Sequence, residues 1–248
     1  MATCVTMEHT SYLSALARDG AGFADACETA GLAASVPACP GWSVADLLWH
    51  MTEVHHFWRT IVGEQRASTE GYTDPTRPSD LALLPNYRAG LADTVAALSA
   101  ADPAQINWTW SSDHTAGFVV RRMAQETAVH RWDADMAAGA SKPIEAELAS
   151  DGVDEFLTHM ISDVVADAPA VAGSVHLHCT DVAGEWMVHP IEDGGGVVTR
   201  EHAKGDAALR GAASDLLLVL WRRVGLAAVD VVGDAGVAAR FVAHTSLD

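Results

Sequence analysis

The sequence predicts two domains, a four-helix bundle followed by a smaller α+β domain. The first half carries long stretches in which apolar residues recur at intervals of three and four, and the second half carries short stretches of strand type. The character changes after the segment GASKP, so the expected domains cover residues 1–148 and 149–248. A chain of 248 residues is long enough for two modest domains, each with a core of its own.

The expected bundle begins with a helix over residues 8–32, which ends near Gly31. The segment VPACPGW then interrupts the chain. Ser43 is placed to cap a second helix over residues 43–65, with Asp46 three positions later in a capping-box arrangement. The apolar residues of this helix recur at helical spacing and predict one buried face; they are Val44, Leu47, Leu48, Met51, Val54, Trp58, Ile61 and Val62.

Two further helices are expected over residues 80–99 and 117–139. A loop rich in proline, threonine and serine covers residues 67–79 and precedes the first of them, and the long connection SAADPAQINWTWSSDHTAG precedes the second. Long loops in compact domains often carry function. Four helices joined in this way predict a bundle, whose interior can hold a ligand between facing helices.

The second half begins with SDGVDEFLTHMISDVVADA, which is still helical and could belong to either domain. Short strands are expected at SVHLHCTD, GEWMVHPI and GVVTREHA, and the segment EDGGG between the last two is a hairpin-turn signal. A helix over residues 205–223, a strand at VDVVGD and a closing helix at AGVAARFVAHT complete the prediction. Together these elements describe a small α+β domain.

Charge and apolar content narrow the class of protein. The chain has 15 Lys and Arg against 33 Asp and Glu, a formal charge of −18, and its basic residues are scattered. Such a protein repels phosphate backbones and anionic membrane surfaces, which argues against nucleic acid or a membrane as partner. The N-terminus lacks the pattern of a signal peptide, and the densest apolar stretch, DLLLVLW, is too short to cross a bilayer. We therefore expect a cytoplasmic protein.

The cysteines and the glycine-rich segments give no catalytic pattern. Four dispersed cysteines form no CxxC pair, and we expect reduced thiols that act as small buried side chains; they are Cys4, Cys27, Cys39 and Cys179. The sequence has no GxSxG elbow, no Walker loop and no Rossmann fingerprint. Nothing in it indicates a nucleotide.

The clearest chemical pattern is AQETAVHRWDAD, in which Glu126 and His130 lie four positions apart. On a helix such residues share a face one turn apart, so both side chains can reach one ion. His50 is the best candidate for a third ligand because it stands close to the apolar face of its helix, where an imidazole needs a partner. Two His and one Glu leave at least one open position on zinc, as in catalytic sites. A hydrogen-bonded core histidine and a solvated Glu–His pair are the alternatives.

His55 and His56 follow on the same helix as His50. Adjacent helical residues project about 100 degrees apart, so at most one of the two could join His50 at an ion. We expect instead that His55 or His56 borders the cleft or solvent.

A second, weaker pattern lies in the expected strand SVHLHCTD, where His176 and His178 alternate onto one face and could chelate a metal. The sequence suggests no third ligand near them, so ordinary packing or surface exposure is the alternative. His189 and His202 give still weaker indications of metal binding.

Three stretches together resemble a known family: CPGWSVADLLWHMTEVHHFW, then ETAVHRWDAD some 70 residues later, then LRGAASDLLLVLWRRV with VVGDAGVAARF near the end. In this order they resemble the mycothiol-dependent maleylpyruvate isomerase family, over nearly the whole chain. The resemblance implies a DinB-like four-helix bundle and a small C-terminal α+β domain. It also implies that His50, Glu126 and His130 hold a divalent metal ion, usually zinc, with the remaining positions open to water or a thiol.

The resemblance further implies an arginine at the end of the long C-terminal helix that faces the substrate cleft. The sequence here reads LWRRV where the family commonly has Gly before the Arg, so Arg223 is the better match and Arg222 is the unexpected residue. A guanidinium at this place could hold a substrate carboxylate through two parallel hydrogen bonds. The alternative for either arginine is a last-turn residue that satisfies helix carbonyls.

The function implied is that of an enzyme in which a zinc-bound thiol, mycothiol, is deprotonated and attacks an electrophilic small molecule. Elimination after bond rotation would isomerise a cis double bond, as with maleylpyruvate. Retention of the sulfur would give a conjugate, as in an S-transferase of detoxification or biosynthesis. Two other classes stay open: a metal or thiol sensor without turnover, and a metal-dependent hydrolase of thiol conjugates.

Overall fold

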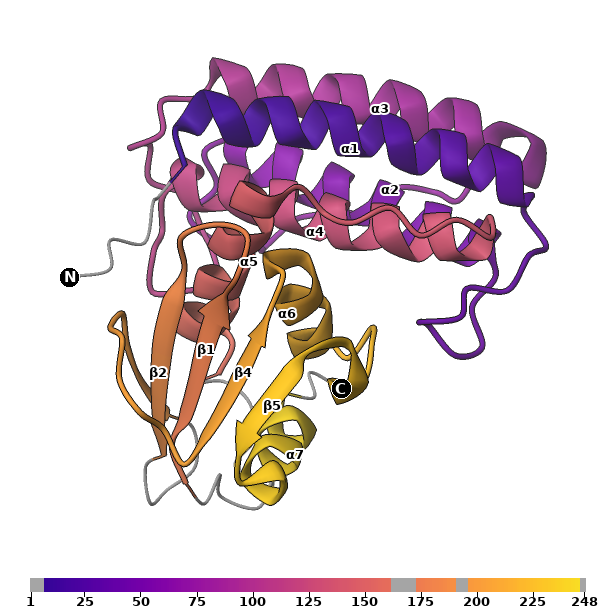
Figure 1. The fold of residues 1–248 in the computed structure, drawn as a ribbon. Helices are drawn as coiled ribbons and strands as arrows, with labels where there is room; N and C mark the ends of the chain where they lie inside the picture. Colours follow the sequence, from indigo (N-terminus) through magenta and orange to yellow (C-terminus); the bar gives the residue numbers. More distant parts are fainter. Residues whose placement is uncertain (1–6, 162–172, 191–195, 246–248) are drawn as a thin grey trace. The chain divides into compact units, whose positions relative to one another are not determined.

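The computed structural model describes residues 7–161, 173–190 and 196–245. They divide into two compact units, one from Glu8 to Lys142 and one from Pro143 onward. Figure 1 shows that the first unit is helical and that the second contains a sheet, which confirms the predicted fold class. None of the described helices combines the length and the apolar character needed to cross a lipid bilayer.

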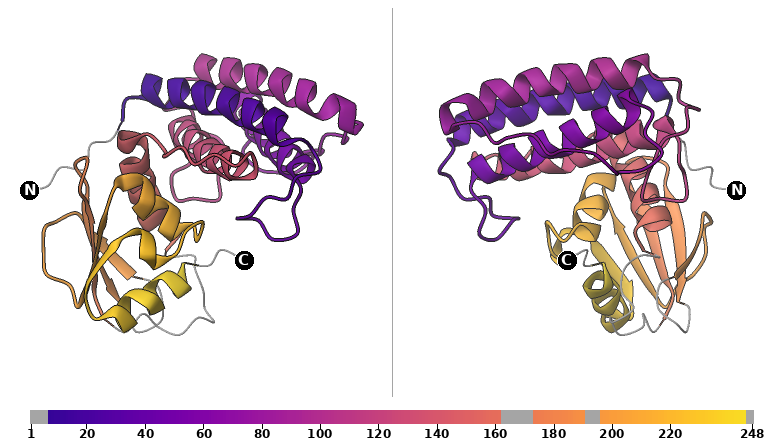
Figure 2. Two further views of the ribbon diagram at one scale, coloured as in Figure 1. Left: turned by 45° about the vertical axis from the view of Figure 1, so that its right-hand side comes forward. Right: turned by 180° about the vertical axis from the view of Figure 1, so that it is seen from behind.

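The N-terminal unit is a bundle of four helices, and α1 and α2 each pack against both α3 and α4 (Figure 2). The helices are α1 (His9–Ala30), α2 (Val44–Gly63), α3 (Asp80–Ala100) and α4 (Ala116–Ala137). All four end within two residues of the bounds that apolar periodicity and capping predict. The interior is filled by large side chains that are buried almost completely, among them Phe23, Leu47, Met51, Ile61, Leu83 and Leu98.

Local signals fix the ends of the helices that carry the site. The Asp46 backbone N–H donates to Ser43 Oγ at 3.3 Å and the Ser43 N–H donates to Asp46 Oδ2 at 3.0 Å, which is the predicted capping box at the start of α2. Thr115 caps α4 in a similar way, since its hydroxyl accepts the backbone N–H of Phe118 at 3.2 Å. These caps fix the residues at which α2 and α4 begin.

The C-terminal unit contains a five-stranded sheet in the order β3-β2-β1-β4-β5, in which only the β1–β4 pair is parallel. Its strands are β1 (Val175–Cys179), β2 (Glu185–Pro190), β3 (Gly196–Thr199), β4 (Ala207–Gly211) and β5 (Asp230–Gly233). Its helices are α5 (Ala146–His159), α6 (Ala213–Leu220), the short 3₁₀ helix η1 (Leu226–Ala228) and α7 (Ala235–His244).

The two faces of this sheet differ in character. Helices α6 and α7 contact β1 and β4, and the side chains of Leu177, Trp186 and Leu209 are completely buried on that side. Strand residues alternate between faces, so His176 and His178 of β1 lie on the opposite face. The histidines of β1 therefore belong to the outer face of the sheet.

One predicted element is wrong. The expected helix over residues 205–223 is in fact strand β4 followed by helix α6. Ala, Leu and Arg favour helices when considered alone, but residues 207–211 pair with β1 on one side and β5 on the other, and this pairing overrides their local preference. The turn EDGGG, apart from its last residue, the end of the helix predicted after residue 161, and Cys4 lie outside the described residues.

Candidate metal centre

Three side chains meet within the bundle: His50 of α2, and Glu126 and His130 of α4. The Nε2 atom of His50 lies 3.5 Å from Glu126 Oε1, and the Nε2 atom of His130 lies 3.3 Å from the same oxygen. The centroids of the two imidazole rings are 5.0 Å apart. The structure thus brings together the three residues that spacing and resemblance had singled out.

The donor atoms have the separation that a metal ion needs. Ligands about 2 Å from a tetrahedral zinc ion lie about 3.3 Å from one another. The two distances to Glu126 Oε1, 3.3 and 3.5 Å, agree with that spacing, and all three donors lie within 4.8 Å of one another. Two imidazole nitrogens and one carboxylate oxygen are also a donor set that zinc accepts, so the residues fit the ion.

The site is open on one side. The side chain of His130 is 9% exposed and that of Glu126 is 20% exposed, whereas that of His50 is 33% exposed. Solvent therefore reaches the site at His50 more readily than at His130. The ring of Trp42 packs edge-on against His50, with centroids 5.2 Å apart, and limits the rotation of that imidazole.

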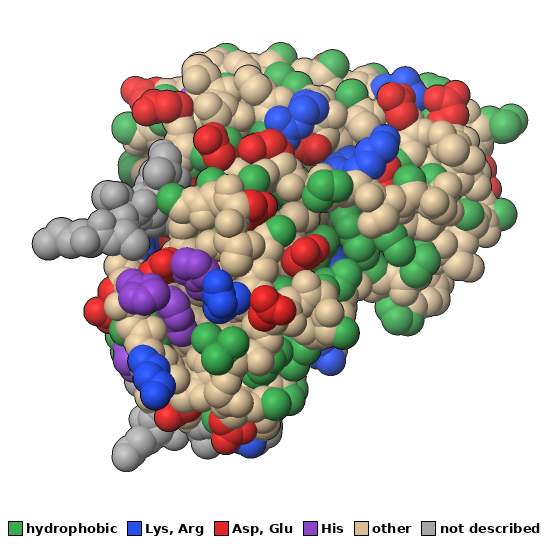
Figure 3. All heavy atoms as spheres, in the orientation of Figure 1, with side chains coloured by type: hydrophobic (Ala, Val, Ile, Leu, Met, Phe, Trp, Pro, Cys, Tyr) green, Lys and Arg blue, Asp and Glu red, His purple; other side chains and the backbone are tan. Residues whose placement is uncertain are grey.

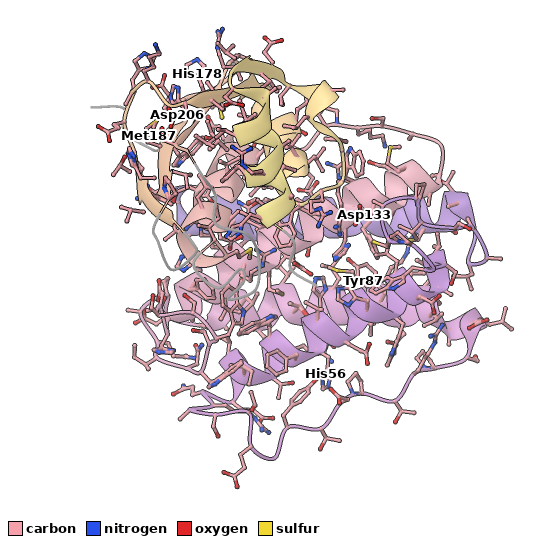
Figure 4. The ribbon with its side chains drawn as sticks, turned by 90° about the horizontal axis from the view of Figure 1, so that it is seen from below. His56, Tyr87, Asp133, His178, Met187 and Asp206 are labelled. Atoms are coloured by element: carbon pink, nitrogen blue, oxygen red, sulfur yellow. The ribbon has the colours of Figure 1, made fainter. Side chains whose placement is uncertain are left out.

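Two further residues of α4 hold the central pair in place. Asp133, which is completely buried, contacts His130 Nδ1 through its Oδ2 atom at 2.8 Å (Figure 4). With the proton on Nδ1, the Nε2 lone pair of His130 is directed to the site. The Arg122 guanidinium donates to Glu126 Oε2 at 2.8 Å and leaves Oε1 to face the imidazoles.

The electrostatics of the site favour an ionised carboxylate. Burial raises the pKa of Glu126, but hydrogen bonds from His130 and His50 and the charge of Arg122 outweigh it, and the net pKa lies well below the ordinary value. Burial lowers the pKa of His130, yet Asp133 and Glu126 together raise it to about 9. A cation that enters the site would replace the proton on His130.

Sequence reasoning did not single out Asp133 or Arg122. The signal was available, because the spacing from Arg122 to Glu126 and from Glu126 to His130 is four, and Asp133 follows three positions later. Residues at these spacings share one face of a helix. A single stripe of α4 therefore carries both the candidate ligands and the residues that position them.

Cys39 lies beside the site. Its Sγ atom is 3.8 Å from Asp133 Oδ2, and together with His130 and Asp133 it forms a second group of potential donors. The prediction of a small buried thiol is confirmed for Cys27 and Cys179, but it is wrong for Cys39, which is only partly buried.

His55 and His56 take no part in the cluster. His55 is 1% exposed, and its Nε2 atom lies 2.9 Å from Thr127 Oγ1, so of the two histidines only His56 can border a cleft or solvent. The position of His55 on α2 turns it into the core, where burial lowers its pKa to about 4. His56 is partly exposed and pairs through Nδ1 with the Tyr72 hydroxyl at 3.0 Å.

The candidate anchor, Arg223, lies in the C-terminal unit just after α6. The backbone N–H of Arg223 donates to Leu218 O at 2.8 Å and that of Arg222 donates to Val219 O at 3.0 Å, which is a Schellman motif with Arg222 in the left-handed conformation (φ 56°). This backbone conformation favours glycine, which agrees with the expectation that Arg222 stands at a position where a glycine is common. The Nη1 atom of Arg223 donates to Trp221 O at 3.1 Å. This contact agrees with the alternative that an arginine at this place satisfies carbonyl groups at the end of the helix.

Comparisons with known proteins agree with the fold. Residues 13–135 match the model of the mycothiol maleylpyruvate isomerase N-terminal domain, and residues 147–240 match that of the MDMPI C-terminal domain. The crystal structure of the mycothiol-dependent maleylpyruvate isomerase is 12% identical, with a TM-score of 0.64 over 93% of this chain and 95% of that one. A histidine-to-alanine mutant of that enzyme has the same TM-score and coverage at 11% identity. No curated protein matches the chain. The two domain matches, in order and over most of its length, show that the chain belongs to the mycothiol-dependent maleylpyruvate isomerase family.

Proposed function

We propose that this chain is a metal-dependent enzyme that uses mycothiol to isomerise the cis double bond of an electrophilic small molecule of the maleylpyruvate type. The observation that carries the proposal is the convergence of His50, Glu126 and His130 on one point, in a chain of this family. The similarity to a mycothiol-dependent maleylpyruvate isomerase supports the choice of thiol and substrate class.

In this proposal His50, Glu126 and His130 hold a divalent ion, most suitably zinc. When bound, such an ion lowers the pKa of a coordinated thiol, so that the thiolate is available at neutral pH. The residues around it have separate tasks. Asp133 holds the orientation of His130, and Arg122 keeps Glu126 ionised and fixes which oxygen faces the site.

We also propose Arg223 as the residue that binds a substrate carboxylate. Its side chain is partly buried and follows a rigid helix end, whereas that of Arg222 is exposed. Loss of a hydrogen bond to a charged group costs about 1.5–3 kcal/mol, so Arg223→Ala should raise KM for the substrate tenfold or more. Arg222→Ala is the matched control and should leave KM unchanged. Equal effects of the two substitutions would contradict the assignment.

The central experiment follows maleylpyruvate with mycothiol and the purified protein, with and without a chelator. Isomerisation should require both the thiol and the metal, and added Zn²⁺ should restore it after chelation. His50→Ala should lower kcat/KM about a thousandfold, because a catalytic metal contributes several kcal/mol. His56→Ala, on the same helix but outside the cluster, should retain activity.

The products separate the alternatives. A stable sulfur conjugate in place of the trans isomer would replace the isomerase with an S-transferase. Hydrolysis of a mycothiol conjugate without isomerisation would favour a hydrolase. If the zinc-loaded protein changed neither maleylpyruvate nor a mycothiol conjugate, the enzymatic proposal would be overturned, and a non-catalytic metal or thiol sensor would remain.

A further inference from the structure

A second cluster of potential metal ligands lies on the outer face of the C-terminal sheet. It consists of His176 and His178 from β1, Glu185 from β2 and His202 from the segment between β3 and β4. Figure 3 shows histidine side chains gathered on the face over β1 and β2. The sequence suggests no third ligand near His176 and His178, whereas the structure places Glu185 and His202 beside them.

Strand register explains how these residues meet. His176 and His178 are two positions apart on β1 and share its outer face, where His178 is labelled in Figure 4. His178 pairs directly with Glu185 in the antiparallel ladder, which places the carboxylate beside the imidazole. The segment after β3 then brings His202 over the same carboxylate. The approach of Glu185 and His202 to this pair does not follow from spacing along the sequence.

Glu185 is the centre of the cluster. Its Oε1 atom lies 2.6 Å from His178 Nδ1, and its Oε2 atom lies 2.8 Å from His202 Nδ1 and 3.9 Å from His176 Nε2. One donor atom from each of the four residues lies within 4.8 Å of every other. A small rotation of the side chains would therefore bring all four to one ion.

His176 carries the argument for a ligand. The residue is 7% exposed, and its Nε2 atom is buried without a hydrogen-bond partner although it faces the cluster. The Nδ1 atom of His178, by contrast, lies 2.6 Å from Glu185 Oε1 and is already engaged by that carboxylate. Buried polar atoms without partners cost about 1–3 kcal/mol each. A simple ion-pair network would satisfy Glu185 but leave His176 Nε2 unpaired.

We propose that His176, His178, Glu185 and His202 form a second site for a divalent transition metal, with Zn²⁺ as the best-suited ion. Three imidazoles and one carboxylate complete a tetrahedral shell with no position left for a reactant, which is the pattern of a structural site. The ion would fasten the segment that carries His202 to β1 and β2. Arg210 on β4 is the register partner of His178, and its positive charge would repel a cation. Its side chain is exposed, so solvent screens that charge.

The test is a Zn²⁺ titration of the full chain after the first site has been removed by His50→Ala and His130→Ala together. This background isolates the second site, so the result does not depend on the proposed function. We expect one equivalent of Zn²⁺ to bind and the thermal unfolding midpoint to rise. Adding His202→Ala, a change at an exposed side chain that should not impair folding, should weaken binding at least tenfold.

Two further variants make the result decisive. Glu185→Gln in the same background should weaken Zn²⁺ binding as His202→Ala does. His189→Ala, an exposed histidine of β2 outside the cluster, should leave it unchanged. Absence of Zn²⁺ binding in the background protein would overturn the proposal. Binding that survives both His202→Ala and Glu185→Gln would overturn it as well.

Discussion

The two histidine clusters use the same kinds of donor but are supported differently. In the bundle, all three donors stand on long helices, and Asp133 and Arg122 hold His130 and Glu126 from behind. On the sheet, three donors stand on strands and the fourth on a connecting segment, and among the described residues the Nε2 atom of His176, which faces the cluster, has no hydrogen-bond partner. The first cluster is therefore preorganised, whereas the second depends on its ion for order.

A substitution at Asp133 gives the largest expected effect on the support of the bundle cluster. Asp133→Asn keeps the shape of the side chain but removes the charge that orients and polarises His130. Loss of such a contact typically weakens metal affinity about 10–100-fold. Competition with a chromophoric chelator measures the change in Zn²⁺ affinity, and Co²⁺ spectra report on the geometry.

Asp135→Asn is the matched control. Asp135 is also buried on α4, but it accepts from Arg131 at 2.6 Å and lies outside the cluster. Its loss should lower the free energy of unfolding without weakening Zn²⁺ binding. If both substitutions reduced the affinity equally, the effect would come from disturbance of α4 and the positioning role of Asp133 would be refuted.

His55 shows what burial does to a histidine of α2 that has no acidic neighbour in hydrogen-bond contact. Its pKa in the folded protein, about 4, lies below the value of about 6.5 in the unfolded chain. As the pH falls through this window the unfolded chain takes up the proton first, so stability present above pH 6.5 is lost towards pH 4. Between pH 7 and pH 5 the contribution of His55 should fall by about 2 kcal/mol.

Urea unfolding at the two pH values measures this loss. In His55→Gln a neutral amide replaces the imidazole, so the difference in unfolding free energy between pH 7 and pH 5 should shrink by about 2 kcal/mol relative to the unmodified protein. The other histidines contribute equally to the pH dependence of both proteins, so their contributions cancel in the comparison. An unchanged pH dependence would mean that His55 is accessible to protons in the folded state.

The order in which the two clusters fill tests the comparison directly. If both bind Zn²⁺, the preorganised cluster of the bundle should bind about tenfold more tightly or better, because its ligands are already oriented. A stepwise Zn²⁺ titration of the unmodified protein should show a tight phase and a weak phase. His50→Ala should remove the tight phase, and His202→Ala should remove the weak phase. The reverse assignment would contradict the link between supporting contacts and affinity.

The same difference explains what the sequence could predict. The bundle and its candidate site depend on helical spacing and on caps such as Ser43 with Asp46, which are local signals. His50, the partner across the bundle, was a candidate because it stands close to the apolar face of its helix, and the resemblance supported it. The cluster on the sheet depends on the register of β1 with β2 and on the return of His202, which no local pattern encodes. Strand β4 was missed for the same reason, because its pairing with two neighbours determines its structure.

The smallest expected effect concerns the ends of α2 and α6, one in each unit. Both helices close with a Schellman motif that has a non-glycine residue in the left-handed region, Gln65 (φ 50°) after α2 and Arg222 (φ 56°) after α6. Arg222→Gly should relieve this strain and raise the free energy of unfolding by about 0.5–1 kcal/mol, with Gln65→Gly giving a similar gain. Arg222→Ala keeps the Cβ and should give none. A gain from Ala equal to that from Gly would show that the charge of Arg222, and not its backbone conformation, limits stability.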